Sequence, residues 1–61
     1  MSEYPVIFEL DVNGEATGIV HFYCCVRCRF DDRYNYTPSA LGTSADWVDG
    51  TVCETCGRTL Q

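Results

Sequence analysis

Two cysteine pairs decide the fold of this chain: Cys25-Val26-Arg27-Cys28 and Cys53-Glu54-Thr55-Cys56-Gly57. Two residues between cysteines allow a tight turn to aim both sulfurs at one ion, and two such turns supply four sulfurs in a tetrahedron. The spacing therefore predicts a single metal site, and its expected ligands are Cys25, Cys28, Cys53 and Cys56. Gly57 suits the position after the second pair, where the backbone often needs a positive φ.

A fifth cysteine, Cys24, directly precedes the first pair. If Cys24 replaced Cys25 as a ligand, three residues would separate it from Cys28, and the longer gap would spoil the turn. The turn geometry therefore favours Cys25 and assigns Cys24 to a small buried apolar position beside the site. His21 shares a strand face with Cys25, but four thiolates already fill the shell of zinc, so we expect an ordinary strand histidine.

The short length of the chain favours a metal over disulfides as the stabilising element. The 61 residues are expected to form one domain, 1–61, and a chain of this size buries only about 60% of its unfolded surface. We find neither a secretory signal nor a membrane-length apolar run. An odd number of cysteines leaves one unpaired in any intramolecular disulfide scheme. We therefore expect a cytoplasmic protein with no membrane partner.

The charge of the chain limits its partners. Nine acidic residues and four basic ones, all of them Arg, give a net charge of −5. Such a field repels phosphate backbones in ordinary salt, so a protein is the expected partner. At molar salt the Debye length falls to about 3 Å, and nucleic-acid binding becomes feasible. The phosphate contacts would then be Arg27, Arg29 and Arg33.

The N-terminal segment 4–24 has the pattern of a β-hairpin. From Phe8 the residues alternate, with Phe8, Leu10 and Val12 on one face and acidic residues on the other. Asn13-Gly14 then favours a two-residue type I′ turn, and the nearby Gly18 leaves a longer loop as the alternative.

The remaining segments are assigned from their turn formers and cysteines. Residues 25–28 are expected to form the first knuckle, and residues 29–46 a long loop rich in Asp, Asn, Ser and Gly. A short helix from Pro38 to Leu41 is the alternative within that loop. Residues 47–60 are expected to form the second knuckle and a closing strand.

No catalytic constellation is visible in the sequence. The chain has one His and no Lys, and four thiolates leave zinc no open coordination position. We therefore expect no catalytic residue and no enzymatic activity.

The chain from the hairpin to Gln61 resembles the small zinc-ribbon, or C2C2 zinc-finger, proteins, in which hairpins carry knuckles like Cys53-Glu54-Thr55-Cys56-Gly57. Its acidic, Lys-free composition is similar to that of the very small zinc-finger proteins of halophilic archaea. Residues 23–31 and 46–48 also resemble parts of rubredoxin, which carries one iron in a four-cysteine site.

These patterns predict a small β-rich zinc ribbon, with an N-terminal β-hairpin and two cysteine knuckles that hold one metal. The zinc-ribbon resemblance implies a zinc-binding protein-interaction or regulatory module. A nucleic-acid-binding transcriptional regulator and a rubredoxin-like iron electron carrier are the alternatives, because a four-sulfur site accepts zinc or iron.

Overall fold

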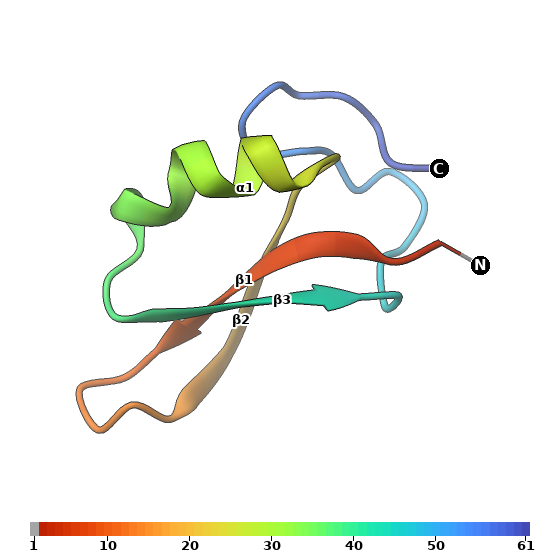
Figure 1. Ribbon diagram of the computed structural model, residues 1–61. Helices are drawn as coiled ribbons and strands as arrows, with labels where there is room; N and C mark the ends of the chain where they lie inside the picture. Colours follow the sequence, from red (N-terminus) through yellow and green to blue (C-terminus); the bar gives the residue numbers. More distant parts are fainter. Residues whose placement is uncertain (1) are drawn as a thin grey trace.

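The computed structural model describes residues 2–61, and its largest element is a three-stranded antiparallel sheet. The strands are β1 (Tyr4–Leu10), β2 (Ala16–Phe22) and β3 (Ser39–Ser44), in the order β2-β1-β3. Between β2 and β3 the chain forms the helix α1 (Val26–Asp32) and the 3-10 turn η1 (Arg33–Asn35). In Figure 1, α1 and the C-terminal segment lie on the same side of the sheet. No helix within residues 2–61 is long and apolar enough to cross a membrane.

The predicted hairpin is confirmed, and its connection is the longer loop rather than the type I′ turn. The amide of Asp11 donates to the carbonyl of Glu15 at 2.8 Å, and that of Gly14 donates to Asp11 at 3.0 Å. Gly14 has a φ of 82°, and between positions 2 and 61 only glycines have a positive φ. Asn13 therefore cannot occupy the first central position of a type I′ turn. Val12 lies in this loop and is 96% exposed, so it does not extend the apolar face of β1.

The expected loop over residues 29–46 is wrong, because that segment contains most of α1, all of η1 and all of β3. The alternative helix from Pro38 to Leu41 is also wrong. Residues 39–44 pair with β1 in an unbroken antiparallel register, from Glu9 opposite Ser39 to Tyr4 opposite Ser44. Their Ser, Ala and Gly residues have low strand propensity, but pairing supplies partners for backbone groups along the otherwise open edge of β1.

The C-terminal arm, residues 47–61, forms a turn and then a small hairpin. Thr51 donates its amide to the carbonyl of Val48 at 3.1 Å, and Gly50 has a φ of 92°, which places the predicted turn at Asp49-Gly50. Val52 and Thr59 form one antiparallel bridge. The arm continues on both sides of this bridge, since Cys53 donates to Arg58 at 2.8 Å and Leu60 to Thr51 at 2.9 Å. The expected closing strand is thus reduced to a bridge and its neighbouring hydrogen bonds.

The core joins the centre of the sheet to the C-terminal arm. A buried cluster contains Ile7, Tyr23, Cys53 and Leu60. The hydroxyl of Tyr23 donates to the Asp32 carboxylate at 2.5 Å, which ties the end of the hairpin to the end of α1. Because a cysteine is one of only four members of this cluster, the core and the cysteine site are a single structural unit.

The two ends of the described chain lie side by side. The indole Nε1 of Trp47 donates to the carbonyl of Ser2 at 2.9 Å, and the Trp47 and Tyr4 rings meet edge to face at 5.4 Å. The Gln61 amide donates to the Tyr4 hydroxyl at 3.0 Å. These contacts fasten the C-terminal arm to the first strand.

Candidate metal centre

Four cysteine sulfurs lie together between the start of α1 and the C-terminal arm. The Sγ atoms of Cys24, Cys28, Cys53 and Cys56 all lie within 4.8 Å of one another. The Cys24 sulfur is 3.6 Å from that of Cys28 and 3.5 Å from that of Cys56. In a tetrahedral site with metal–sulfur bonds of about 2.3 Å, neighbouring sulfurs stand roughly 3.8 Å apart. The donor set and its dimensions therefore fit one metal ion, and all five cysteines are free thiols.

Three of the four predicted ligands belong to this group, and the fourth position is taken by Cys24 instead of Cys25. Cys25 is the N-cap residue of α1, in an extended conformation with φ −156° and ψ 165°, and its side chain is exposed. The expected first knuckle over residues 25–28 is in fact the first turn of this helix. The three residues between Cys24 and Cys28 are therefore compatible with a shared metal site, because the first turn of α1 brings Cys28 back toward Cys24.

The second pair has the predicted knuckle geometry. Gly57 has a φ of 78°, as expected for the residue after the second cysteine, and its amide donates to the carbonyl of Cys53 at 2.8 Å. The turn is fixed to both neighbouring elements. The Glu54 amide donates to the carbonyl of Phe22 in β2 at 3.1 Å, and the Thr55 hydroxyl donates to the carbonyl of Cys28 in α1 at 2.9 Å. The knuckle is therefore held in register with the helix that carries the Cys28 sulfur.

The surroundings of the sulfurs lower the pKa of one thiol and raise the pKa of two others. Burial raises the pKa of Cys53, but hydrogen bonds from backbone amides, led by that of Cys56, outweigh burial and lower the pKa to about 6. A hydrogen bond with the Cys56 thiol raises the pKa of Cys24 to about 11, and burial raises the pKa of Cys28. The metal-free cluster thus keeps some of its protons, and a bound metal would displace them.

A second polar cluster, which the sequence did not predict, lies beside the knuckle. His21 is a strand residue outside the sulfur group, and its ring stands between two carboxylates. Nδ1 is 2.6 Å from Glu54 and Nε2 is 2.6 Å from Glu9. The Tyr36 ring stacks on His21 at 3.8 Å, and its hydroxyl donates to Glu54 at 3.1 Å. Glu9 and His21 lie near each other across the hairpin, a proximity that register could have indicated, but the contact with Glu54 depends on the tertiary fold.

The two carboxylates favour the protonated form of His21. Burial lowers the pKa of its imidazole, but the hydrogen bonds and charges of Glu9 and Glu54 together outweigh burial and raise the pKa above 6.5. Glu54 immediately follows Cys53 of the sulfur group, so the His21 ring links the knuckle to both strands of the hairpin.

A cluster of four cysteines that could bind one metal ion is therefore the candidate functional site of this fold. No protein family, curated protein or solved structure matches the chain.

Proposed function

We propose that this protein is a zinc-stabilised protein-interaction module with a regulatory role, and that it is not an enzyme. The four-sulfur group carries the proposal. Four thiolates, from Cys24, Cys28, Cys53 and Cys56, would complete the tetrahedral shell of Zn²⁺ and leave no coordination position for water or substrate. The metal would then serve the fold, and the function would lie in the surface that the fold presents.

The exposed apolar side chains support an interaction role. Among residues 2–61, eight large hydrophobic side chains are at least 45% exposed, including Tyr34 at 73%, Val26 at 61% and Phe30 at 54%. These three come from one short stretch, α1 and η1, that contains no buried residue. Contiguous exposed apolar residues with a polar rim are typical of recognition surfaces.

An electron carrier is the second candidate, and one observation favours it. The Cys56 side chain is exposed at the edge of the sulfur group. A four-sulfur site accepts iron as well as zinc, and an exposed ligand would offer a short path for an electron. Zinc has no accessible second oxidation state, so the identity of the metal separates the two functions.

Metal analysis and cross-linking of the protein in its native cells test the proposal. We expect a colourless protein with one zinc per chain, and photo-cross-linkers placed on α1 should give protein adducts. Iron with a red colour that bleaches reversibly on reduction would replace the proposal with electron transfer. Nucleic-acid adducts in place of protein adducts would make the chain a nucleic-acid-binding regulator.

A further inference from the structure

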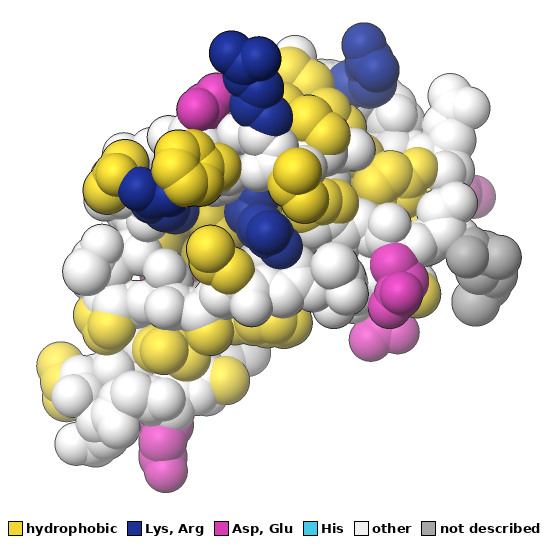
Figure 2. Space-filling view, in the orientation of Figure 1, with side chains coloured by type: hydrophobic (Ala, Val, Ile, Leu, Met, Phe, Trp, Pro, Cys, Tyr) yellow, Lys and Arg dark blue, Asp and Glu magenta, His cyan; other side chains and the backbone are white. Residues whose placement is uncertain are grey.

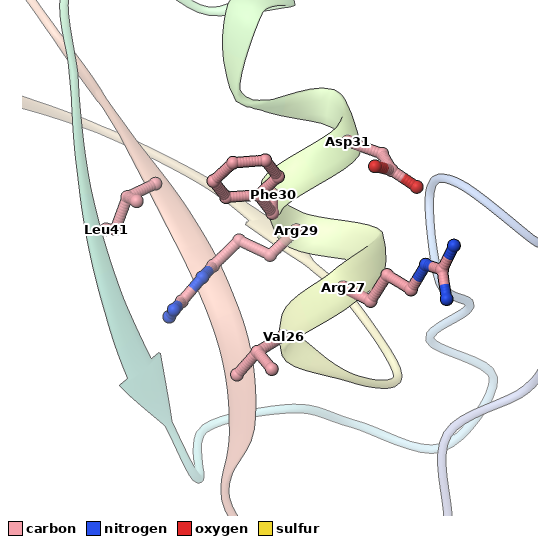
Figure 3. A pocket seen from close by; sticks show the side chains of 6 residues that line it. All are labelled: Val26, Arg27, Arg29, Phe30, Asp31 and Leu41. Atoms are coloured by element: carbon pink, nitrogen blue, oxygen red, sulfur yellow. The ribbon is translucent and has the colours of Figure 1, made fainter.

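A groove runs along α1 beside β3. Its volume is about 480 Å³, and it is lined by Val26, Arg27, Arg29, Phe30, Asp31 and Leu41. Figure 3 shows Val26, Arg29 and Phe30 on the side of α1 that faces Leu41, whereas Arg27 and Asp31 extend from the other side. Phe30 and Leu41 remain 54% and 48% exposed. The groove therefore has an apolar floor that the chain itself leaves uncovered.

Arginines lie around this apolar floor, and none of them forms an ion pair with a carboxylate within residues 2–61. The Arg29 guanidinium donates from Nη1 to the carbonyl of Gly42 at 2.7 Å, and its Nε has no hydrogen-bond partner within residues 2–61. The Arg33 guanidinium lies over the Phe30 ring at 3.6 Å. In the described chain, carboxylates form ion pairs only with His21, although nine acidic residues face four arginines. Figure 2 shows basic side chains gathered around α1 with hydrophobic ones between them.

We propose that this groove binds an acidic, amphipathic peptide segment of a partner protein. The proposal rests on the interaction role proposed above and names the surface and the chemistry of the partner. Aliphatic or aromatic side chains of the segment would cover Val26, Phe30 and Leu41. Its carboxylates would meet the guanidinium groups of Arg27, which lines the groove, and of Arg33, which lies over Phe30, through charge-assisted hydrogen bonds. Three of the four arginines lie in or beside this groove, in a chain of net charge −5, and this local concentration gives the complementarity.

The same contacts favour a peptide over a nucleic acid. Base stacking needs a free aromatic face, but the Arg33 guanidinium covers one face of Phe30 and lies 4.3 Å from the centre of the Tyr34 ring. The groove also contains Asp31, which would repel every phosphate of a continuous backbone that passes it, whereas a peptide can face Asp31 with an uncharged residue and place its carboxylates at the arginines. A peptide can place an apolar side chain where a phosphate backbone must place a charge.

A selection from displayed random peptides tests the proposal, with the zinc-loaded protein as bait. We expect the enriched peptides to combine Asp or Glu with Leu, Phe or Trp. Added to the ¹⁵N-labelled protein, they should shift the amide signals of residues 26–33 and 40–43. Peptides that bind elsewhere, such as at the β2 edge, would overturn the groove and leave the interaction role standing. Failure to enrich any peptide would overturn both.

Matched charge variants provide a second test of the proposal. Arg33→Gln and Arg27→Gln should each weaken binding of a selected peptide roughly three- to fivefold, as expected for one exposed charge pair. Phe30→Ser should weaken it roughly tenfold or more, because it removes the apolar anchor. Arg58→Gln makes the same change in net charge on the C-terminal arm, outside the groove, and should leave binding within about twofold.

Two results would contradict these expectations. Equal weakening by Arg58→Gln would show that only the overall charge matters. Tighter binding of single-stranded oligonucleotides to the same residues, lost in Arg33→Gln, would assign the groove to nucleic acid. Amide spectra of each zinc-loaded variant show whether its fold is intact before binding is compared.

Discussion

At the scale of single residues, the metal centre depends on where α1 begins. Cys25 caps the helix with an extended backbone, so Cys24, just before the cap, and Cys28, in the first turn of the helix, come together with sulfurs at 3.6 Å. If residues 25–28 formed a knuckle, Cys25 would take the place of Cys24. The choice of ligand between two adjacent cysteines is therefore set by the backbone conformation of one residue.

We expect Cys24→Ser to impair metal binding and Cys25→Ser to preserve it. Loss of one thiolate of four should weaken zinc binding by more than the roughly 10- to 100-fold that outer-shell changes cost. Titration with Co²⁺ checks this prediction, because the sulfur-to-cobalt absorption reports the number of thiolates. An intact four-sulfur spectrum for Cys24→Ser, with a weakened one for Cys25→Ser, would reverse the assignment.

His21 should contribute a pH-dependent part of the stability. Its pKa is raised in the folded state, so the contribution is fully present below about pH 6.5, the unfolded value, and is lost as pH rises through the folded pKa. We expect His21→Gln to lower the free energy of unfolding of the zinc-loaded protein on the order of 1 kcal/mol near pH 6, because both carboxylates are partly exposed. Above the folded pKa the difference should shrink.

Denaturant unfolding of both proteins, at several pH values and a fixed zinc concentration, measures this difference. The comparison cancels the pH dependence that the cysteines give to both proteins alike. A difference that grows with rising pH would contradict the protonated state of His21.

At the scale of elements, the hairpin shows how a local signal fixes a turn. Asp11 Oδ1 accepts the amides of Asn13 at 2.8 Å and Glu15 at 3.0 Å, and Gly14 supplies the one left-handed residue. Within the connection over residues 11–15, a turn closed by the Gly14–Asp11 hydrogen bond therefore ends in a left-handed glycine, as in hairpin loops with a glycine bulge. Gly14 would suit either this loop or a type I′ turn, so the dipeptide Asn13-Gly14 alone does not predict which of the two turns forms.

Gly14→Ala should lower the free energy of unfolding by about 1 kcal/mol, because a side chain raises the cost of the left-handed conformation. A Cβ at this position meets nothing within 4 Å, so the cost comes from the backbone alone. Gly14→Asn is the matched control and should cost less, since Asn tolerates that conformation. Thermal or denaturant unfolding of the two variants checks the order, and equal losses would contradict the backbone explanation.

At the scale of the whole molecule, the metal should hold three parts of the chain together. Cys24 lies between β2 and α1, Cys28 lies in α1, and Cys53 and Cys56 lie in the C-terminal arm. The arm has one strand bridge within residues 2–61, and its buried residues Cys53 and Leu60 are shared with the core of the sheet. Loss of the metal would therefore release the arm and open the core.

Removal of the metal should leave little fixed tertiary structure. Structural zinc contributes roughly 10–16 kcal/mol of apparent binding free energy in zinc-finger peptides, which matches or exceeds the stability of most domains. We expect the amide NMR signals to collapse to a narrow range on chelation and to recover when zinc is restored. A chelated protein that keeps the dispersed signals of β1, β2 and β3 would show that the sheet folds without the metal.

The sequence by itself determined the features that depend on neighbouring residues. The strand alternation from Phe8, the turn formers around Gly14 and the knuckle with Gly57 are local patterns, and each predicts its element because the interacting groups lie a few residues apart. The existence of one four-cysteine site also followed, since paired spacing reflects the reach of two sulfurs toward one ion.

Only the tertiary structure decided the identity of the fourth sulfur, the strand β3 and the groove beside α1. Residues 39–44 have weak strand propensity and become a strand because β1 offers them an open edge. The seven-residue α1 is too short to be stable alone, and the Tyr23–Asp32 and Arg29–Gly42 hydrogen bonds hold it in place. These contacts join residues that are distant in sequence or separated by an irregular segment, so no local pattern encodes them. Cys24 replaces Cys25 for the same reason, because the position of that helix decides which sulfur faces the site.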